Sequence, residues 1–353
     1  MGSFTAAGAW TALVTPFDRQ GKLDIDAYRK LIEYQLAERI DGLVPCGTTG
    51  ESPTLSWDEH NEAIEVAIRT AGGKASILAG TGSNCTDEAI AATKHAREAG
   101  ADAALLVDCY YNKPSSLELR TEYYERVLHW VPEIPLVPYV IPGRSVTALS
   151  AADLAILHRQ HPQRVPAVKQ ATGDLERMRQ DRALAGPTLG IFSGDDDLTL
   201  AMMQDPQIGA CGVISVMTNL LPGAVRKMVH AQRSGDAATA GDLGRKLAPI
   251  FKLVVCPVTS KRSIPGGATV EVQDKFPNPL AVKAMMNGLG LPAGFSRAPL
   301  GRLSAPGVAA CRQAVREVYA AAPELFATLE LLFGVKVGER LANDGAWNGL
   351  ARA

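Results

Sequence analysis

The chain has 353 residues, which is too long for one small domain and suits one large domain with an appendage. Hydrophobic residues make up 46% of it and charged residues 21%, the balance of an ordinary globular protein. The formal net charge of −1 argues against nucleic acid or an anionic membrane surface as the main partner.

The six cysteines are scattered, with no CxxC pair and no Cys/His cluster. This pattern favours free thiols in a reducing compartment and argues against a structural zinc site. Residues 1–12 lack a basic region followed by a long apolar run, and no stretch reaches the roughly 18 apolar residues of a membrane span. We therefore expect a cytoplasmic protein with no metal site and no membrane partner.

Short apolar runs alternate with longer amphipathic stretches over the first 220 or so residues, a pattern typical of repeated βα units. The expected strands are 11–16, 42–46, 76–79, 103–107, 135–141, a run around Lys169, 190–193 and 211–216. Continuous apolar runs indicate parallel strands that are buried on both faces. Eight such units predict a (β/α)8 TIM barrel, with its reaction centre at the C-terminal ends of the strands. An open doubly wound sheet would carry a Gly-rich fingerprint after the first strand, which is absent.

Beyond about residue 222 the alternation stops and the sequence is mostly helical in pattern. We therefore expect a catalytic barrel at 1–222 and a C-terminal helical region at 223–353. The helix candidates of this region are 224–232, 236–254, 279–288, 307–321 and 324–333. A Ser/Pro/Gly-rich stretch at 256–277 interrupts them and is predicted to be a loop insertion.

One charged side chain stands out in the sixth apolar run, Lys169. An ammonium at the end of a buried strand is costly to desolvate, so it is paired, snorkels to water or is driven towards the neutral amine. A neutral lysine in a pocket is the nucleophile that condenses with ketones and aldehydes to form a Schiff base.

Other polar residues follow the ends of predicted strands and would share the barrel mouth with Lys169: Thr48, Thr49, Tyr110, Tyr111, Tyr139 and Arg144. Singly, each has an ordinary structural explanation, such as a tight turn at 47–50 or a core aromatic at Tyr139. The three acids at 195–197 are expected to form a capping, solvated loop, not a metal site.

Taken together, these residues supply what Schiff-base chemistry with a keto acid requires. The turn at 47–50 can bind a carboxylate with its backbone N–H groups, and Arg144 can bind a second carboxylate with its planar guanidinium group. The hydroxyls of Tyr139, Thr49 and Tyr111 can pass protons during carbinolamine formation and loss. No cofactor is needed for this chemistry.

Five motifs occur in the same order as in a known family: Gly47-Thr-Thr-Gly-Glu51, Tyr110-Tyr-Asn-Lys-Pro-Ser115, Tyr139 with Pro142-Gly-Arg144, Val168-Lys-Gln-Ala-Thr-Gly173 and Gly212-Val-Ile-Ser215. The chain resembles the dihydrodipicolinate synthase / N-acetylneuraminate lyase family of class I, pyruvate-dependent aldolases. The likeness covers roughly residues 9–219, with a looser helical match to about 291.

The resemblance implies a role for each matching residue. Lys169 would form the imine with pyruvate, Thr48 and Thr49 would bind its carboxylate, and Tyr139 would be the acid/base. The remaining positions would be Gly194 and Ile214 lining the pyruvate pocket, Arg144 receiving the carboxylate of aspartate semialdehyde, and Tyr111 reaching into the neighbouring subunit of a homo-oligomer (a dimer or a tetramer of dimers). Arg144 and the Thr-Thr pair favour the synthase branch, on the route to diaminopimelate and lysine.

The resemblance also suggests a site for inhibitory lysine, at Ser52, Trp57, His60, Asn84, Glu88 and Tyr110. The chain departs from the family pattern at Val140, where asparagine is common, in the 256–277 insertion and in the tail after about 321.

Two alternatives to the synthase stay open. Another pyruvate aldolase or dehydratase, acting on 2-keto-3-deoxy sugar acids, 4-hydroxy-2-oxoglutarate or N-acetylneuraminate, would share Lys169 and Tyr139. A non-catalytic keto-acid-binding barrel would be expected to have lost one of the two. A metal-dependent barrel enzyme lacks a convergent His/carboxylate set.

Overall fold

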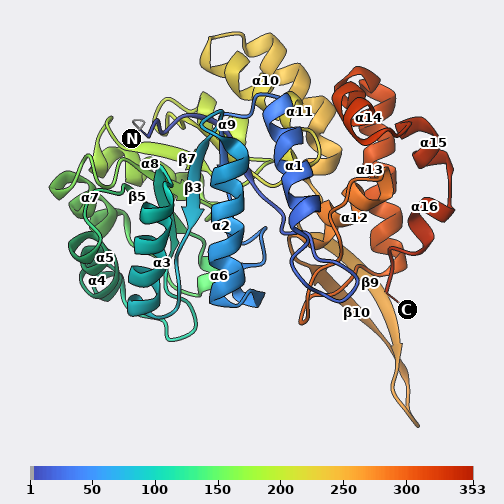
Figure 1. The fold of residues 1–353 in the computed structure, drawn as a ribbon, viewed down its shortest axis with the longest axis horizontal. Coiled ribbons are helices and arrows are strands. Elements are labelled where there is room, and N and C mark those ends of the chain that lie inside the picture. The colour runs from blue at the N-terminus through green and yellow to red at the C-terminus, as the bar shows by residue number, and fades with distance from the viewer. Residues whose placement is uncertain (1–3, 353) are drawn as a thin grey trace.

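Eight parallel strands close into a barrel in the computed structural model, which describes residues 4–352 (Figure 1). They are β1 (Gly8–Ala12), β2 (Gly42–Val44), β3 (Ser76–Gly80), β4 (Ala103–Val107), β5 (Leu136–Val140), β6 (Ala167–Gln170), β7 (Gly190–Ser193) and β8 (Gly212–Ser215). Each strand pairs with its neighbours in chain order, and β8 pairs with β1. The predicted (β/α)8 barrel is confirmed.

The first strand lies earlier in the chain than predicted. It ends at Ala12, not at Pro16, although Leu13 and Val14 are as buried as the strand itself. The amide of Val14 donates to the Asn219 side chain instead of to a strand, and Pro16 has no N–H to give to a ladder. The apolar run is therefore longer than the strand, because the residues that follow the strand are buried without pairing in the sheet.

Helices connect the strands and cover the outside of the barrel (Figure 1). Within the barrel region they are α1 (Ile25–Ala37), η1 (Ser52–Thr54), α2 (Trp57–Ala71), α3 (Thr86–Ala99), α4 (Ser116–Glu118), η2 (Leu119–Tyr124), α5 (Glu125–Trp130), α6 (Pro142–Ser145), α7 (Ala151–Gln160), α8 (Leu175–Ala185), α9 (Thr199–Gln204) and η3 (Met217–Asn219). After it come α10 (Pro222–Arg233), α11 (Ala237–Phe251), α12 (Leu280–Leu289), α13 (Ala305–Ala321), η4 (Pro323–Phe326), α14 (Ala327–Phe333), α15 (Val337–Ala342) and α16 (Gly345–Asn348). No helix in residues 4–352 is long and apolar enough to cross a membrane.

Close backbone approach explains the glycine at the seam where the barrel closes. Gly8 of β1 is the register partner of Gly212 of β8. A Cβ built on Gly212 would lie 1.9 Å from the carbonyl oxygen of Gly8, so no larger residue fits without moving a strand.

Buried hydrophobic residues cluster both inside the barrel and outside it. Inside the barrel, Trp10, Leu105, Tyr139, Phe192 and Ile214 belong to one buried cluster. Outside it, the C-terminal helices α12 and α13 share a second cluster with α1, α2, α10 and α11. This shared core holds the segment around residue 278 beside the barrel.

The 256–277 segment is a β-hairpin, so the prediction of a loop was wrong. Strands β9 (Cys256–Ser263) and β10 (Thr269–Phe276) pair antiparallel along their whole length. The glycines are confined to the turn, where Ile264 N donates to Ala268 O and Gly266 has a positive φ. Beyond it, both strands contain β-branched residues, which favour strand over loop: Val258, Thr259, Thr269, Val270 and Val272.

Candidate functional site

Lys169 lies inside the barrel beside Tyr139. The β5–β6 register pairs the two residues directly, and side chains of register partners point to the same face of a sheet. The Nζ of Lys169 lies 4.1 Å from the centroid of the Tyr139 ring, and only 5% of Lys169 is exposed. The snorkelling alternative does not describe this side chain, because it is enclosed by the barrel.

Gly194, the residue after β7, leaves room for this lysine. A Cβ at Gly194 would lie 3.1 Å from Cε of Lys169 and 2.9 Å from the carbonyl oxygen of Gln170. Ile214 is fully buried in the same interior cluster as Tyr139. Of the two positions predicted to line the pyruvate pocket, Gly194 therefore directly follows β7 and Ile214 lies on β8.

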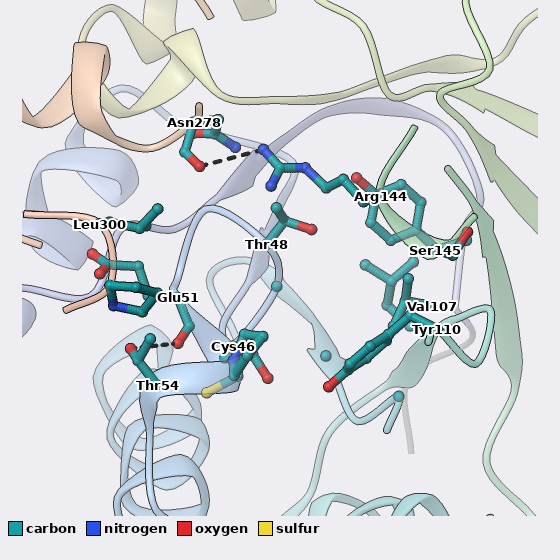
Figure 2. A pocket seen from close by; sticks show the side chains of 18 residues that line it. Cys46, Thr48, Glu51, Thr54, Val107, Tyr110, Arg144, Ser145, Asn278 and Leu300 are labelled. Carbon is teal, nitrogen blue, oxygen red and sulfur yellow. Dashed lines mark hydrogen bonds between the residues drawn. The ribbon is translucent and has the colours of Figure 1, made fainter. Parts of the chain in front are cut away.

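A cavity of about 280 Å³ opens at the C-terminal ends of β2, β3, β4 and β5. Figure 2 shows side chains that line it, with Arg144 reaching across Thr48 towards Asn278. Among the residues proposed from the sequence, those that line it are Thr48, Ser52, Tyr110, Tyr139 and Arg144. Residues distant in sequence thus converge at the barrel mouth, as the parallel topology requires.

The turn after β2 presents two free amides. Gly50 N donates to Gly47 O at 3.1 Å, and Glu51 N donates to Thr48 O at 3.1 Å. The amides of Thr48 and Thr49 have no hydrogen-bond partner among residues 4–352. Neighbouring free N–H groups of this kind can bind a carboxylate.

Asn278 is a site residue that the sequence analysis missed. Its Nδ2 donates to Oγ1 of the buried Thr49 at 2.9 Å, and its carbonyl oxygen accepts from Arg144 at 3.3 Å. It therefore contacts both predicted carboxylate-binding positions. The Asn-Pro pair at 278–279 signals a turn before a helix, but nothing local connects it with a residue 229 positions earlier.

A buried ion pair holds the same turn against α12. Lys283 donates to Oε1 of Glu51 at 2.6 Å and to the carbonyl oxygen of Thr15 at 2.7 Å. The amide of Arg297 donates to the other carboxylate oxygen of Glu51. Burial lowers the pKa of Lys283, and the charge of Glu51 opposes this shift. The C-terminal region is thus part of the frame of the pocket.

A family model and curated relatives match most of the chain. The model of the dihydrodipicolinate synthetase family matches residues 5–264. The 4-hydroxy-tetrahydrodipicolinate synthase of Synechococcus sp. (strain WH7803) is 40% identical over 290 residues, 82% of this chain and 88% of the relative. The chain belongs to the dihydrodipicolinate synthetase family.

Solved structures of synthases superpose on the chain. The 4-hydroxy-tetrahydrodipicolinate synthase of Methylacidiphilum fumariolicum SolV has a TM-score of 0.80 at 31% identity, covering 91% of this chain and 99% of that one. A DHDPS from Cyanidioschyzon merolae, solved with lysine bound, has a TM-score of 0.78 at 30% identity, covering 88% and 98%.

Tyr111 lies outside the lining of the cavity. It is 83% exposed, has a φ of 73° and does not line the cavity, unlike its neighbour Tyr110. A left-handed backbone is uncommon for a bulky side chain. This member of the dihydrodipicolinate synthetase family therefore presents a large aromatic group outward, beside the mouth of its own site.

The residues matched to a lysine site divide into two groups. Ser52 and Tyr110 line the cavity, whereas the others lie outside its lining: Trp57, His60, Asn84 and Glu88. Trp57 packs edge-on against His60, with ring centroids 5.0 Å apart. Burial lowers the pKa of His60 to about 4, so its imidazole is neutral near pH 7.

Burial also raises the pKa of Tyr110, and the nearby charge of Glu88 adds to the shift. Oδ1 of Asn84 is buried and has no hydrogen-bond partner among residues 4–352. An unsatisfied buried acceptor of this kind is costly unless a ligand or water serves it.

Two departures from expectation concern buried positions. The acids at 195–197 are not simply a solvated loop, because Asp196 is buried and accepts hydrogen bonds from Ser215 Oγ and from Val216 N. Burial raises the pKa of Asp195 to about 6, the charge of Asp197 adds to this, and the charge of Lys169 opposes it.

Val140 is buried between the barrel and its helices, away from the pocket. Residues 4–352 contain no group of side chains that could hold a metal ion.

Proposed function

We propose that the chain is a 4-hydroxy-tetrahydrodipicolinate synthase, which condenses pyruvate with L-aspartate 4-semialdehyde through a Schiff base on Lys169. The observation that carries the proposal is the buried amine of Lys169 against the ring of Tyr139, a residue that also lines the cavity at the barrel mouth together with Thr48 and Arg144. The synthases at about 40% identity over most of the chain support the choice of substrates.

The Lys169 amine attacks C2 of pyruvate, and the resulting carbinolamine loses water to give the imine. A proton then leaves the methyl carbon, and the enamine adds to the aldehyde carbon of the second substrate. Ring closure by the amino group of that substrate at C2 displaces Lys169 and releases the product. Tyr139 passes protons in these steps, with Thr49 and Tyr111 completing the relay.

The two carboxylates take separate places. The free amides of Thr48 and Thr49 bind the carboxylate of pyruvate, close to Lys169. Arg144, at the rim, binds the carboxylate of the aldehyde with its planar fork. Asn278 orients both positions, because it contacts Thr49 with its side chain and Arg144 with its carbonyl group.

The decisive experiment is borohydride reduction in the presence of pyruvate, followed by mass mapping. We expect one reduced pyruvate adduct on the peptide that contains Lys169, and no adduct and no turnover in Lys169→Ala. An adduct on another lysine would overturn the mechanism. A panel of aldehydes tests the second substrate, and Arg144→Ala should raise the KM for the preferred aldehyde more than that for pyruvate.

Another pyruvate-dependent aldolase remains the second candidate function, since Lys169 and Tyr139 would serve it equally well. The aldehyde panel separates the two: preference for a sugar-derived aldehyde or glyoxylate over aspartate semialdehyde would favour the alternative.

We propose residues 1–222 as the catalytic part and 223–353 as its support, with Asn278 as the exception. The scattered free cysteines support a cytoplasmic location.

We also propose that free lysine binds beside this pocket. Its site would consist of the six residues matched to a lysine site: Ser52, Trp57, His60, Asn84, Glu88 and Tyr110. The unpaired Oδ1 of Asn84 and the carboxylate of Glu88 suit an ammonium group, and the Cyanidioschyzon merolae relative was solved with lysine bound. Calorimetric titration should show L-lysine binding that Glu88→Gln weakens at least roughly tenfold, because a charged hydrogen bond is lost. No heat and no inhibition at saturating lysine would refute the idea.

Finally, we propose that Tyr111 enters the site of a neighbouring subunit in a homo-oligomer. Its exposure and outward direction support this arrangement. The hydroxyl relay is then complete only between subunits.

A further inference from the structure

The β9–β10 hairpin forms an arm that projects from the body of the molecule (Figure 1). Its base is packed: Cys256 and Val258 are buried in the core that α13 shares. Beyond the base, most residues of both strands are exposed. A two-stranded hairpin alone is marginally stable in water, so a long arm of this kind is expected to gain stability from a further surface.

The arm has two different faces. The face of Val258 continues towards the tip with the apolar residues Val272, Val270 and Ile264, of which the last two are 39% and 52% exposed. The same face also carries a polar group, in which Ser260 and Arg262 donate to Asp274. The opposite face is entirely polar beyond Pro257: Thr259, Lys261, Ser263, Thr269, Glu271, Gln273 and Lys275. This alternation is typical of a sheet with one covered face.

The two edges of the arm differ as well. The β9 side lies against α13 at its base and contains Pro257, which cannot donate a ladder hydrogen bond. The β10 edge has no strand beside it in the described chain, and β10 contains neither proline nor glycine. Natural proteins usually protect such an edge. This one is open to another strand.

The ladder shows which backbone groups the open edge presents. Ile264 N donates to Ala268 O at the turn, and hydrogen-bonded pairs alternate with non-hydrogen-bonded pairs along an antiparallel ladder. Counting from the turn, the pair Thr259–Gln273 is non-hydrogen-bonded. The N–H and C=O of Gln273 therefore point outward from β10. The same holds for Glu271 and Lys275, two positions to either side.

The charged residues of this edge are arranged so that two copies of the edge can pair opposite charges. If two copies of β10 pair antiparallel about Gln273, Glu271 lies opposite Lys275 of the partner subunit, and Lys275 opposite Glu271 of the partner subunit. On the other face, Val270 lies opposite Phe276 of the partner subunit, and Val272 lies opposite Asp274 of the partner subunit, a carboxylate that Arg262 of its own arm neutralises. Centring the pairing on Glu271 or on Lys275 instead would place like charges opposite each other, which is destabilising.

We propose that β10 is an interface for a second copy of this chain, in which two arms join about a two-fold axis at Gln273 into one four-stranded sheet. Such an interface is isologous, because the same surface is used by both subunits. It pairs the outward N–H and C=O groups of Glu271, Gln273 and Lys275. It also brings the exposed valines of both arms onto one face. The inference does not depend on the proposed function.

Cysteine cross-linking on the full chain tests the axis. In Gln273→Cys the two thiols face each other across the axis, at a Cα separation of about 5.5 Å that a disulfide can span. We expect mild oxidation to yield a covalent dimer that reducing agent dissolves. Thr259→Cys, the register partner on the other edge, is the matched control and should form no covalent dimer. The unmodified chain reports the background from the exposed Cys85. Equal cross-linking of the two variants would overturn the proposal.

A charge exchange tests the register without new cysteines. Lys275→Glu places two glutamates opposite each other at each end of the interface, and the expected result is a roughly threefold to tenfold weaker association in sedimentation velocity. The double variant Glu271→Lys/Lys275→Glu restores opposite charges and should recover the association. If the single variant associates as the unmodified chain does, or the double variant fails to recover, the proposed pairing is wrong.

Discussion

In the proposed mechanism, the ring and the hydroxyl of Tyr139 have separate tasks. The ring covers the Nζ of Lys169 at 4.1 Å, and the residue also lines the cavity where substrates would enter. An aromatic face attracts a cation and excludes water, so the ring alone can hold the lysine in position. The hydroxyl is then free to move protons to and from the reacting carbon and nitrogen atoms.

Replacement of Tyr139 by phenylalanine separates these tasks. The ring remains, so we expect the fold and a borohydride-trapped pyruvate adduct on Lys169 to persist. The kcat should fall by about 10²–10⁴-fold, because a proton-transfer group is lost. Steady-state kinetics together with adduct mass measure both effects. Unchanged kcat would remove Tyr139 from the mechanism, and loss of the adduct would show that the hydroxyl is needed for imine formation itself.

At the scale of elements, Asp108 joins the end of β4 to two helical segments. Its Oδ1 accepts from the hydroxyl of Tyr124 in η2 at 2.5 Å, and its Oδ2 accepts from Leu149 N, just before α7, at 3.0 Å. Burial raises the pKa of Asp108 to about 7, and the hydrogen bond from Tyr124 opposes the shift. The folded protein therefore favours the protonated carboxyl group more than the unfolded chain does.

This shift has a definite sign in stability. An aspartate in the unfolded chain loses its proton near pH 4, whereas folded Asp108 keeps it to about pH 7. Between these values the folded state binds more protons, so the contribution of this group to stability falls as pH rises. Asp108→Asn is neutral throughout. Its carbonyl oxygen can accept from Leu149 N, and its amide nitrogen can donate to the hydroxyl oxygen of Tyr124, which itself donates to Leu106 O.

We expect Asp108→Asn to flatten the loss of stability between pH 5 and pH 8 by an amount on the order of a few kcal/mol. Urea unfolding at several pH values measures this. Asp87→Asn, on the exposed first turn of α3, is the matched control and should leave the slope unchanged. If Asp108→Asn has the same pH slope as the unmodified chain, Asp108 is ionised in the fold.

At the scale of the whole molecule, we propose that the site is divided between subunits. Lys169 lies inside the barrel, whereas Tyr111 of the same barrel is exposed. In an isologous pair each subunit would lend its Tyr111 to the other. Defects in the two residues then complement each other only when subunits mix.

Subunit mixing makes this prediction quantitative. Lys169→Ala and Tyr111→Phe should each be strongly impaired alone. When the two are unfolded and refolded together in equal amounts, about a quarter of the sites become intact by random pairing, and activity should rise towards that fraction. Activity assays before and after mixing measure the gain. No gain, with hybrid oligomers present by mass spectrometry, would place Tyr111 outside the relay.

The sequence by itself determined the barrel and its central lysine. Buried parallel strands require continuous apolar runs, and this local property was visible in all eight strands, most closely at 103–107 and 190–193. Lys169 was visible because it is a charge within such a run. Strand ends were less certain where buried residues continued past the ladder, as at Leu13 and Val14.

Only the tertiary structure decided which distant residues meet. The Lys169–Tyr139 contact depends on the β5–β6 register, and the bonds of Asn278 to Thr49 and of Lys283 to Glu51 join segments more than 200 residues apart. The hairpin at 256–276 likewise became clear only from its pairing. Periodicity reports how each segment is buried, but closure of the barrel and packing of the C-terminal helices determine the partners, because these depend on the whole chain at once.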